Sequence, residues 1–174
     1  MFPRTTAVAA LLVSGLFLTA CTATGNAPPS PSPDDVIKAA TEKLTGDCLA
    51  RQGLAPPRPG QPTPPAAEQR RVSDALFGAD TAELSLRLPT GYVVRAHTDG
   101  CLAAAQQRLY GDQRRWFRTS VIVNNLQPEA DKTHRSLAEV RSRHRAEIAE
   151  WQRLRAHALA EAISLLTAKG NPSA

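Results

Sequence analysis

The sequence predicts a mainly α-helical fold: a long antiparallel helical hairpin with an N-terminal helix and a small β-hairpin, stapled by a disulfide. Residues 129–168 contain neither glycine nor proline, and their apolar side chains recur at near-helical spacing. Apolar and polar residues alternate at 84–88, and β-branched and aromatic residues follow a turn at 92–96, which predicts a single β-hairpin. The chain has 174 residues, 42% of them hydrophobic, which suits one domain with a core of ordinary size. These figures exclude a multidomain enzyme and a polytopic membrane protein.

An apolar run at 7–18 opens the chain, and Arg4 is the only charge before it. The run has twelve residues, whereas a helix needs about 20 residues to span a hydrocarbon core. A short apolar run that is followed by small residues is typical of an export signal. The sequence therefore predicts an exported protein whose first segment is removed.

The motif Leu18-Thr19-Ala20-Cys21 closes this run. It resembles the lipobox of bacterial lipoprotein signal peptides, in which an aliphatic residue and two small residues precede an invariant cysteine. The resemblance implies that residues 1–20 are removed as the signal peptide and that Cys21 receives the lipid, with acyl chains such as palmitate. The mature protein is then expected to be anchored at the extracytoplasmic face of the cell membrane. An ordinary secretory signal is the alternative.

Residues 21–33 comprise the expected lipidated cysteine and a proline-rich tether. The tether is expected because this polar stretch has almost no apolar side chains to bury. Proline-rich sequence extends by about 3.1 Å per residue, so the tether reaches up to roughly 37 Å from the bilayer. One helical domain is expected at 34–170, and a disordered tail at 171–174. Removal of Arg4 with the signal leaves 20 basic and 16 acidic residues, a net charge of +4.

The domain is expected to begin with a helix over about 35–52. Asp34 and Asp35 are good N-caps, and apolar residues follow them at helical spacing. A proline-rich loop at 55–66 comes next, because its prolines exclude a helix or a central strand. A short helix over about 66–77 follows this loop.

The alternating residues 84–88 and the β-branched and aromatic residues 92–96 predict the two strands of the hairpin. Asp99 is then expected to cap a helix that extends to about residue 122 and bends at Gly111. Because a two-stranded hairpin is marginal in water, it must pack against the helices.

Residues 129–168 are expected to form one helix about 60 Å long, which packs antiparallel to the preceding helix. His144 lies on the apolar seam of this helix between Val140 and Ile148. A histidine in such a place is expected to be partly buried and hydrogen-bonded.

Cys48 and Cys101 are the cysteines that remain besides Cys21. Exported chains meet oxidising conditions, so an even pair is most simply interpreted as a disulfide. The bond would close a loop of about 54 residues, worth on the order of 4 kcal/mol in a chain-entropy treatment. A redox pair or a metal site is the alternative, although no Cys-x-x-Cys motif occurs.

The chain has none of the common motifs of serine hydrolases, zinc proteases or nucleotide-binding proteins. No catalytic residue, metal or cofactor is therefore predicted, and an enzyme is less favoured. His97 and Asp99 are the closest pair of metal-ligating types, but Asp99 is more simply explained as a helix cap.

Arginines crowd the two predicted long helices, and a basic surface attracts anions. Export makes nucleic acid an unsuitable partner, so an anionic wall polymer or an envelope protein is expected instead. A solvated charged face is the alternative. The candidate surface for an anionic partner consists of Arg114, Arg115, Arg118, Arg141 and Arg145.

The mature part resembles a group of small secreted or lipid-anchored proteins of high-GC Gram-positive bacteria, a group without an assigned activity. The resemblance implies an exported address, a disulfide and a helical fold, and no catalytic residue. The expected function is a membrane-anchored, non-enzymatic binding or scaffolding module at the cell envelope. A cell-wall-acting enzyme or an inhibitor of one, with Asp99 or Asp112 in a cleft, is the alternative. The resemblance rests on Asp47-Cys48-Leu49, Gly100-Cys101-Leu102-Ala103, Leu109-Tyr110-Gly111-Asp112, Arg115-Trp116-Phe117, Val123-Asn124-Asn125-Leu126 and Trp151.

Overall fold

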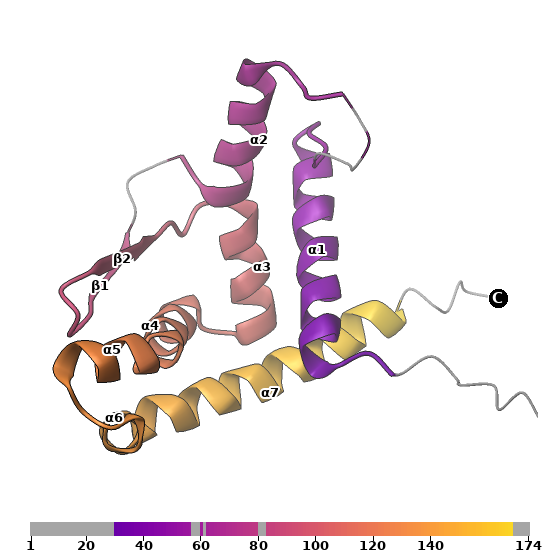
Figure 1. Ribbon diagram of the computed structural model, residues 1–174. Helices are drawn as coiled ribbons and strands as arrows, with labels where there is room; N and C mark the ends of the chain where they lie inside the picture. Colours follow the sequence, from indigo (N-terminus) through magenta and orange to yellow (C-terminus); the bar gives the residue numbers. More distant parts are fainter. Residues whose placement is uncertain (1–29, 57–59, 61, 80–82, 169–174) are drawn as a thin grey trace, which may run out of the picture. The chain divides into compact units, whose positions relative to one another are not determined.

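The computed structural model describes residues 30–56, 60, 62–79 and 83–168. These residues are mainly helical and contain one antiparallel pair of strands, so the predicted fold class is confirmed (Figure 1). The expected signal peptide at 1–20, Cys21 and the tail at 171–174 lie outside the described residues. The elements in chain order are α1 (Pro33–Arg51), α2 (Ala66–Phe77), β1 (Leu84–Arg87), β2 (Val93–Ala96), α3 (Cys101–Tyr110), α4 (Gln113–Asn124), α5 (Leu126–Thr133), α6 (Leu137–Arg143) and α7 (Arg145–Thr167).

Helix α7 lies across α1 and α3, which pack side by side (Figure 1). Helix α4 packs along the first half of α7. Ion pairs join Arg115 to Glu150 and Arg118 to Glu147. Because residue numbers rise along α4 while those of their partners fall along α7, the two helices are antiparallel, as the sequence predicted.

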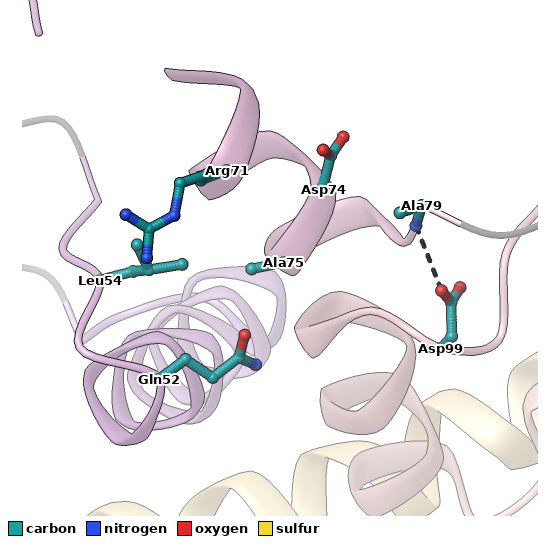
Figure 2. A pocket seen from close by; sticks show the side chains of 7 residues that line it. All are labelled: Gln52, Leu54, Arg71, Asp74, Ala75, Ala79 and Asp99. Carbon is teal, nitrogen blue, oxygen red and sulfur yellow. Dashed lines mark hydrogen bonds between the residues drawn. The ribbon is translucent and has the colours of Figure 1, made fainter. Parts of the chain in front are cut away.

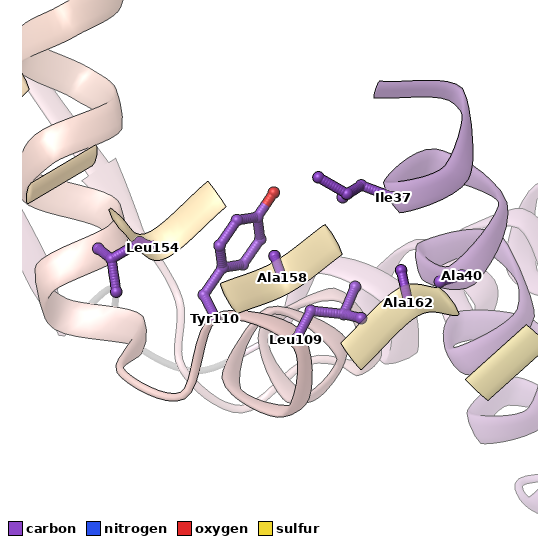
Figure 3. Packing of buried hydrophobic residues seen from close by; sticks show 7 residues of the cluster. All are labelled: Ile37, Ala40, Leu109, Tyr110, Leu154, Ala158 and Ala162. Atoms are coloured by element: carbon purple, nitrogen blue, oxygen red, sulfur yellow. The ribbon is translucent and has the colours of Figure 1, made fainter. Parts of the chain in front are cut away.

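The larger core lies where α1 and α3 meet α7 (Figure 3). Alanines form part of this contact, and Ala40, Ala158 and Ala162 are fully buried. Tyr110 belongs to this core and stacks on Trp116, with ring centroids 3.6 Å apart. Burial raises the pKa of the Tyr110 hydroxyl to about 12. The buried members of this core are Ile37, Ala40, Leu109, Tyr110, Leu154, Ala158 and Ala162.

A smaller core joins α4, α5 and α6 and receives one face of the β-hairpin, through Leu86. In the hairpin, Leu84 pairs with Ala96 and Leu86 with Val94, and these side chains are buried or partly buried. Alternation places the intervening residues of both strands on the opposite face, toward solvent. The buried members of this smaller core are Ile122, Leu126, Ala130 and Val140.

The single helix expected over 129–168 is wrong, because the chain breaks twice within it. His134 adopts a left-handed conformation with φ of 53° and ends α5. Ser136 then forms a capping box with Glu139 and starts α6, and a capping box satisfies the free N–H groups of a new helix. A second break falls at His144, which separates α6 from α7. A side-chain cap therefore starts a new helix at Ser136 in a stretch that lacks glycine and proline, whereas the break at His144 has no side-chain cap.

Capping also differs from the prediction at the start of α1. The N-cap is Ser32, not Asp34 or Asp35, and Asp35 completes a capping box with it. These hydrogen bonds with Ser32 lower the pKa of Asp35. Helix α1 begins at Pro33, the last residue of the predicted tether, because proline is favourable in the first helical turn.

The helix expected from Asp99 to residue 122 is divided into α3 and α4. Gly111 has φ of 74° and follows the last residue of α3. Asp112 then caps α4, because its side chain accepts a hydrogen bond from the Arg115 N–H at 3.0 Å. The cap of α3 is Gly100 and not Asp99, so the predicted role of Asp99 is wrong.

Gly100 lets the end of α2 approach the start of α3. A Cβ at residue 100 would lie 2.6 Å from the backbone N of Gly78, and equally close to the carbonyl O of Leu76. Because backbone cannot move aside as a side chain does, we expect Gly100→Ala to lower the free energy of unfolding by about 1–3 kcal/mol. Urea unfolding measures this loss.

Gly46→Ala is the matched control for this substitution. Gly46 lies inside α1 and a Cβ there meets nothing within 4 Å. Alanine stabilises a helix interior by about 0.5–1 kcal/mol relative to glycine, so the free energy of unfolding of this variant should rise slightly. Equal unfolding midpoints for Gly100→Ala and the unchanged protein would contradict the proposed close contact.

Candidate functional site

The disulfide predicted between Cys48 and Cys101 is confirmed, with 5.7 Å between the two Cα atoms. Cys48 lies in the last part of α1, and Cys101 is the first residue of α3. Cys101 is buried, and Cys48 is partly exposed. The amide Nε2 of Gln52 lies 3.4 Å from the Cys101 sulfur and 3.7 Å from that of Cys48. The bond therefore joins two helices of the larger core and lies beneath a polar side chain.

A polar hollow of about 400 Å³ opens beside this disulfide (Figure 2). Gln52 connects the two features, since it touches the sulfurs and also lines the hollow. Figure 2 shows the Arg71 side chain extended from α2 toward Leu54, whereas Asp74 points away from it. The hollow is shallow and presents the guanidinium of Arg71 and the side-chain amide of Gln52. The lining residues are Gln52, Leu54, Arg71, Asp74, Ala75, Ala79 and Asp99.

Asp99 holds the far side of this hollow in place. Its Oδ2 accepts a hydrogen bond from the Ala79 N–H at 3.1 Å, which ties the chain after α2 to the start of α3. His97 Nδ1 lies 3.8 Å from Asp99 Oδ1. Within the described part of the chain, no group of three or more metal-ligating side chains is arranged to hold a metal ion.

The five predicted arginines do not share one environment. Arg115 pairs with Asp112 at 3.2 Å and with Glu150 at 3.9 Å, and Arg118 pairs with Glu147 at 3.6 Å. Such exposed ion pairs contribute about 0–1 kcal/mol each, but they compensate the charge of both guanidinium groups. Asp112, named above as a candidate acid, is thus a helix cap and an ion-pair partner.

The other three predicted arginines, Arg114, Arg141 and Arg145, are exposed. None of them pairs with a carboxylate among the residues that the structure describes. They lie on three different helices, α4, α6 and α7. The basic charge that is free to attract an anion is therefore carried by these three members of the predicted set.

His144 is partly buried and hydrogen-bonded, as predicted. Its Nε2 lies 2.9 Å from Oε2 of Glu129, and its Nδ1 lies 3.9 Å from Oε2 of Glu147. Glu129 is in α5, and its side chain is only 8% exposed. This partner was not predictable from the sequence, because a continuous helix over 129–168 would have kept the two residues apart.

Comparison with known proteins assigns this chain to no family. No protein family, curated protein or solved structure matches this chain. None of the described helices combines the length and apolarity needed to cross a membrane. The lipobox and the likeness to small Gram-positive lipoproteins stay predictions from the sequence, and the residues described above carry the functional argument.

Proposed function

We propose that this chain is an extracytoplasmic lipoprotein, anchored to the cell membrane through Cys21, whose helical domain serves as a non-enzymatic binding or scaffolding module at the cell envelope. The observation that carries the proposal is the disulfide between Cys48 and Cys101. Disulfides persist in oxidising compartments outside the cytoplasm, which agrees with the export signal and lipobox at the N-terminus. The lipobox at 18–21 and the disulfide between Cys48 and Cys101 therefore both support an extracytoplasmic location.

Lipid attachment is a sufficient anchor for such a domain. One acyl chain binds a membrane only marginally, whereas two or more chains hold stably. Helix α1 begins at Pro33, only twelve residues after Cys21. The domain would therefore stay close to the membrane surface, with its charged faces available to an anionic wall polymer or an envelope protein.

The Cys21→Ala variant tests the anchor. In a bacterial host that processes lipoproteins, the unchanged protein should fractionate with the membrane and carry the added mass of the lipid. The variant should lose both the added mass and the membrane association, because no thiol remains to accept the diacylglyceryl group. Mass spectrometry and cell fractionation measure the two effects.

Thr22→Ala is the control, since it changes the neighbouring residue and leaves the four-residue motif intact. It should behave as the unchanged protein. A Cys21→Ala protein that stays in the membrane with the same mass as the unchanged protein would refute the proposal.

A further inference from the structure

The β-hairpin presents an outer face that the cores do not use. Its members come from both strands, because Ser85 pairs with Arg95 and Arg87 pairs with Val93. All four are exposed, while the opposite face packs on the smaller core. Tyr92 comes one residue before Val93 at the turn, so strand alternation does not place it on this face, but its side chain is exposed at the same end of the hairpin. The four strand residues and Tyr92 together are called the hairpin face below.

Two large apolar side chains of the hairpin face are exposed to solvent. Tyr92 is 76% exposed and Val93 is 38% exposed. They are consecutive in the chain, whereas isolated surface hydrophobic residues are common and need no explanation. Tyrosine combines an apolar ring with a polar hydroxyl and is favoured where one end is apolar and the other is wet.

The hairpin face is also basic. Arg87 and Arg95 are diagonal neighbours across the two strands, a relation that places Cβ atoms within about 7–8 Å of one another. Neither forms an ion pair with any carboxylate in the described part of the chain. Two guanidinium groups at this separation are able to contact neighbouring phosphates, which they bind through paired N–H donors.

Arg114 of α4 extends this basic surface. It lines a hollow of about 200 Å³ together with Ser85 of the hairpin face. Two other charged residues border the same hollow. Glu83 accepts a hydrogen bond from the Thr98 hydroxyl at 2.5 Å, and Arg118 pairs with Glu147. Arg114 forms no ion pair within the described part of the chain, although the Glu83 carboxylate lies in the same hollow, and it adds a third exposed guanidinium beside the hairpin.

We infer that the hairpin face is a membrane-contact site that binds a bilayer containing anionic phospholipids. Arg87, Arg95 and Arg114 match the negative headgroups, and Tyr92 with Val93 enters the boundary between headgroups and acyl chains. A soluble phosphate polymer offers the same charge but no apolar layer in which to bury these two side chains. The inference rests on the proposed function for the nearness of a membrane, and it supplies a second contact besides the lipid.

The test uses the unit of residues 31–174, which contains every described helix and strand, both cores and the disulfide. This unit lacks Cys21 and the apolar run at 7–18, so any binding is independent of the anchor. Flotation with vesicles compares pure phosphatidylcholine with a mixture of two parts phosphatidylcholine and one part phosphatidylglycerol. The unit should bind the anionic vesicles, more weakly at high salt, and leave the neutral vesicles unbound.

Substitutions then assign the binding to the hairpin face. Each arginine near an anionic surface changes affinity by about fivefold, so Arg87→Gln with Arg95→Gln should weaken binding roughly 25-fold. Arg141→Gln with Arg145→Gln is the control, because it removes the same charge from exposed positions on α6 and α7. Tyr92→Ser leaves the charge unchanged and should also weaken binding several-fold.

Three results would each overturn the inference. They are absence of binding to the anionic vesicles, equal losses in the two double-arginine variants, and full binding by Tyr92→Ser. The last result would instead indicate attraction to anionic charge alone. A failure of lipidation at Cys21 is detected separately by the mass of the full chain, so the two proposals fail independently. The retained disulfide and circular dichroism spectrum verify that each variant is folded.

Discussion

Replacing both Cys48 and Cys101 with alanine is expected to lower the free energy of unfolding by about 4 kcal/mol, on the chain-entropy treatment of a closed loop. The two cysteines are 53 residues apart in the sequence. The loop between them holds α2 and the whole β-hairpin. Reduction of the bond therefore frees a large part of the unfolded chain, while α1 and α3 lose their covalent link in the folded state.

Urea unfolding with and without dithiothreitol measures this effect. The unchanged protein should unfold at a lower urea concentration when dithiothreitol is present. The double-alanine variant should unfold near the reduced protein under both conditions, because it has no bond to reduce. If dithiothreitol leaves the midpoint of the unchanged protein in place, the disulfide does not stabilise the domain and the prediction is wrong.

Helix and strand type followed from local sequence more readily than helix ends did. The strands follow from local patterns, because residues 84–88 alternate and residues 92–96 are β-branched and aromatic. The break before α6 was missed although its signal is present, since Ser136 and Glu139 have the spacing of a capping box. A helix can therefore begin at a side-chain cap even where neither glycine nor proline ends the preceding helix. The same spacing at Ser32 and Asp35 starts α1.

Most contacts between residues far apart in the chain could not be predicted from the sequence pattern. The disulfide was predictable because only one pair of cysteines remained once Cys21 was assigned to the lipid. Asp99 was misread as a helix cap, because its partner, the Ala79 N–H, belongs to the end of another helix. Arg87 and Arg95 come together through strand register, whereas the sequence drew attention to the arginines of the helices. Register and helix breaks therefore decide which charges share a surface.

His144→Leu is expected to lower the free energy of unfolding by about 1–3 kcal/mol, the usual cost of leaving a buried polar group without its hydrogen-bond partner. His144 contacts Glu129, whose side chain is only 8% exposed. The imidazole also lies 3.9 Å from Glu147, which pairs with Arg118 of α4. Leucine removes the hydrogen-bond partner and leaves the Glu129 carboxylate buried without compensation. The same substitution loosens the junction between α6 and α7, which His144 occupies.

The double variant Glu129→Leu with His144→Leu separates charge from packing. Replacing both partners of a buried pair by apolar residues is often neutral or stabilising, so the double variant should recover most of the lost stability in urea unfolding. His157→Leu is the matched control, since His157 is exposed on α7 and surface substitutions usually change stability by less than about 0.5 kcal/mol. If His144→Leu lowers the free energy of unfolding no more than His157→Leu does, the contact between His144 and Glu129 does not stabilise the fold. If the double variant is less stable than His144→Leu, packing around the junction outweighs the charge of Glu129.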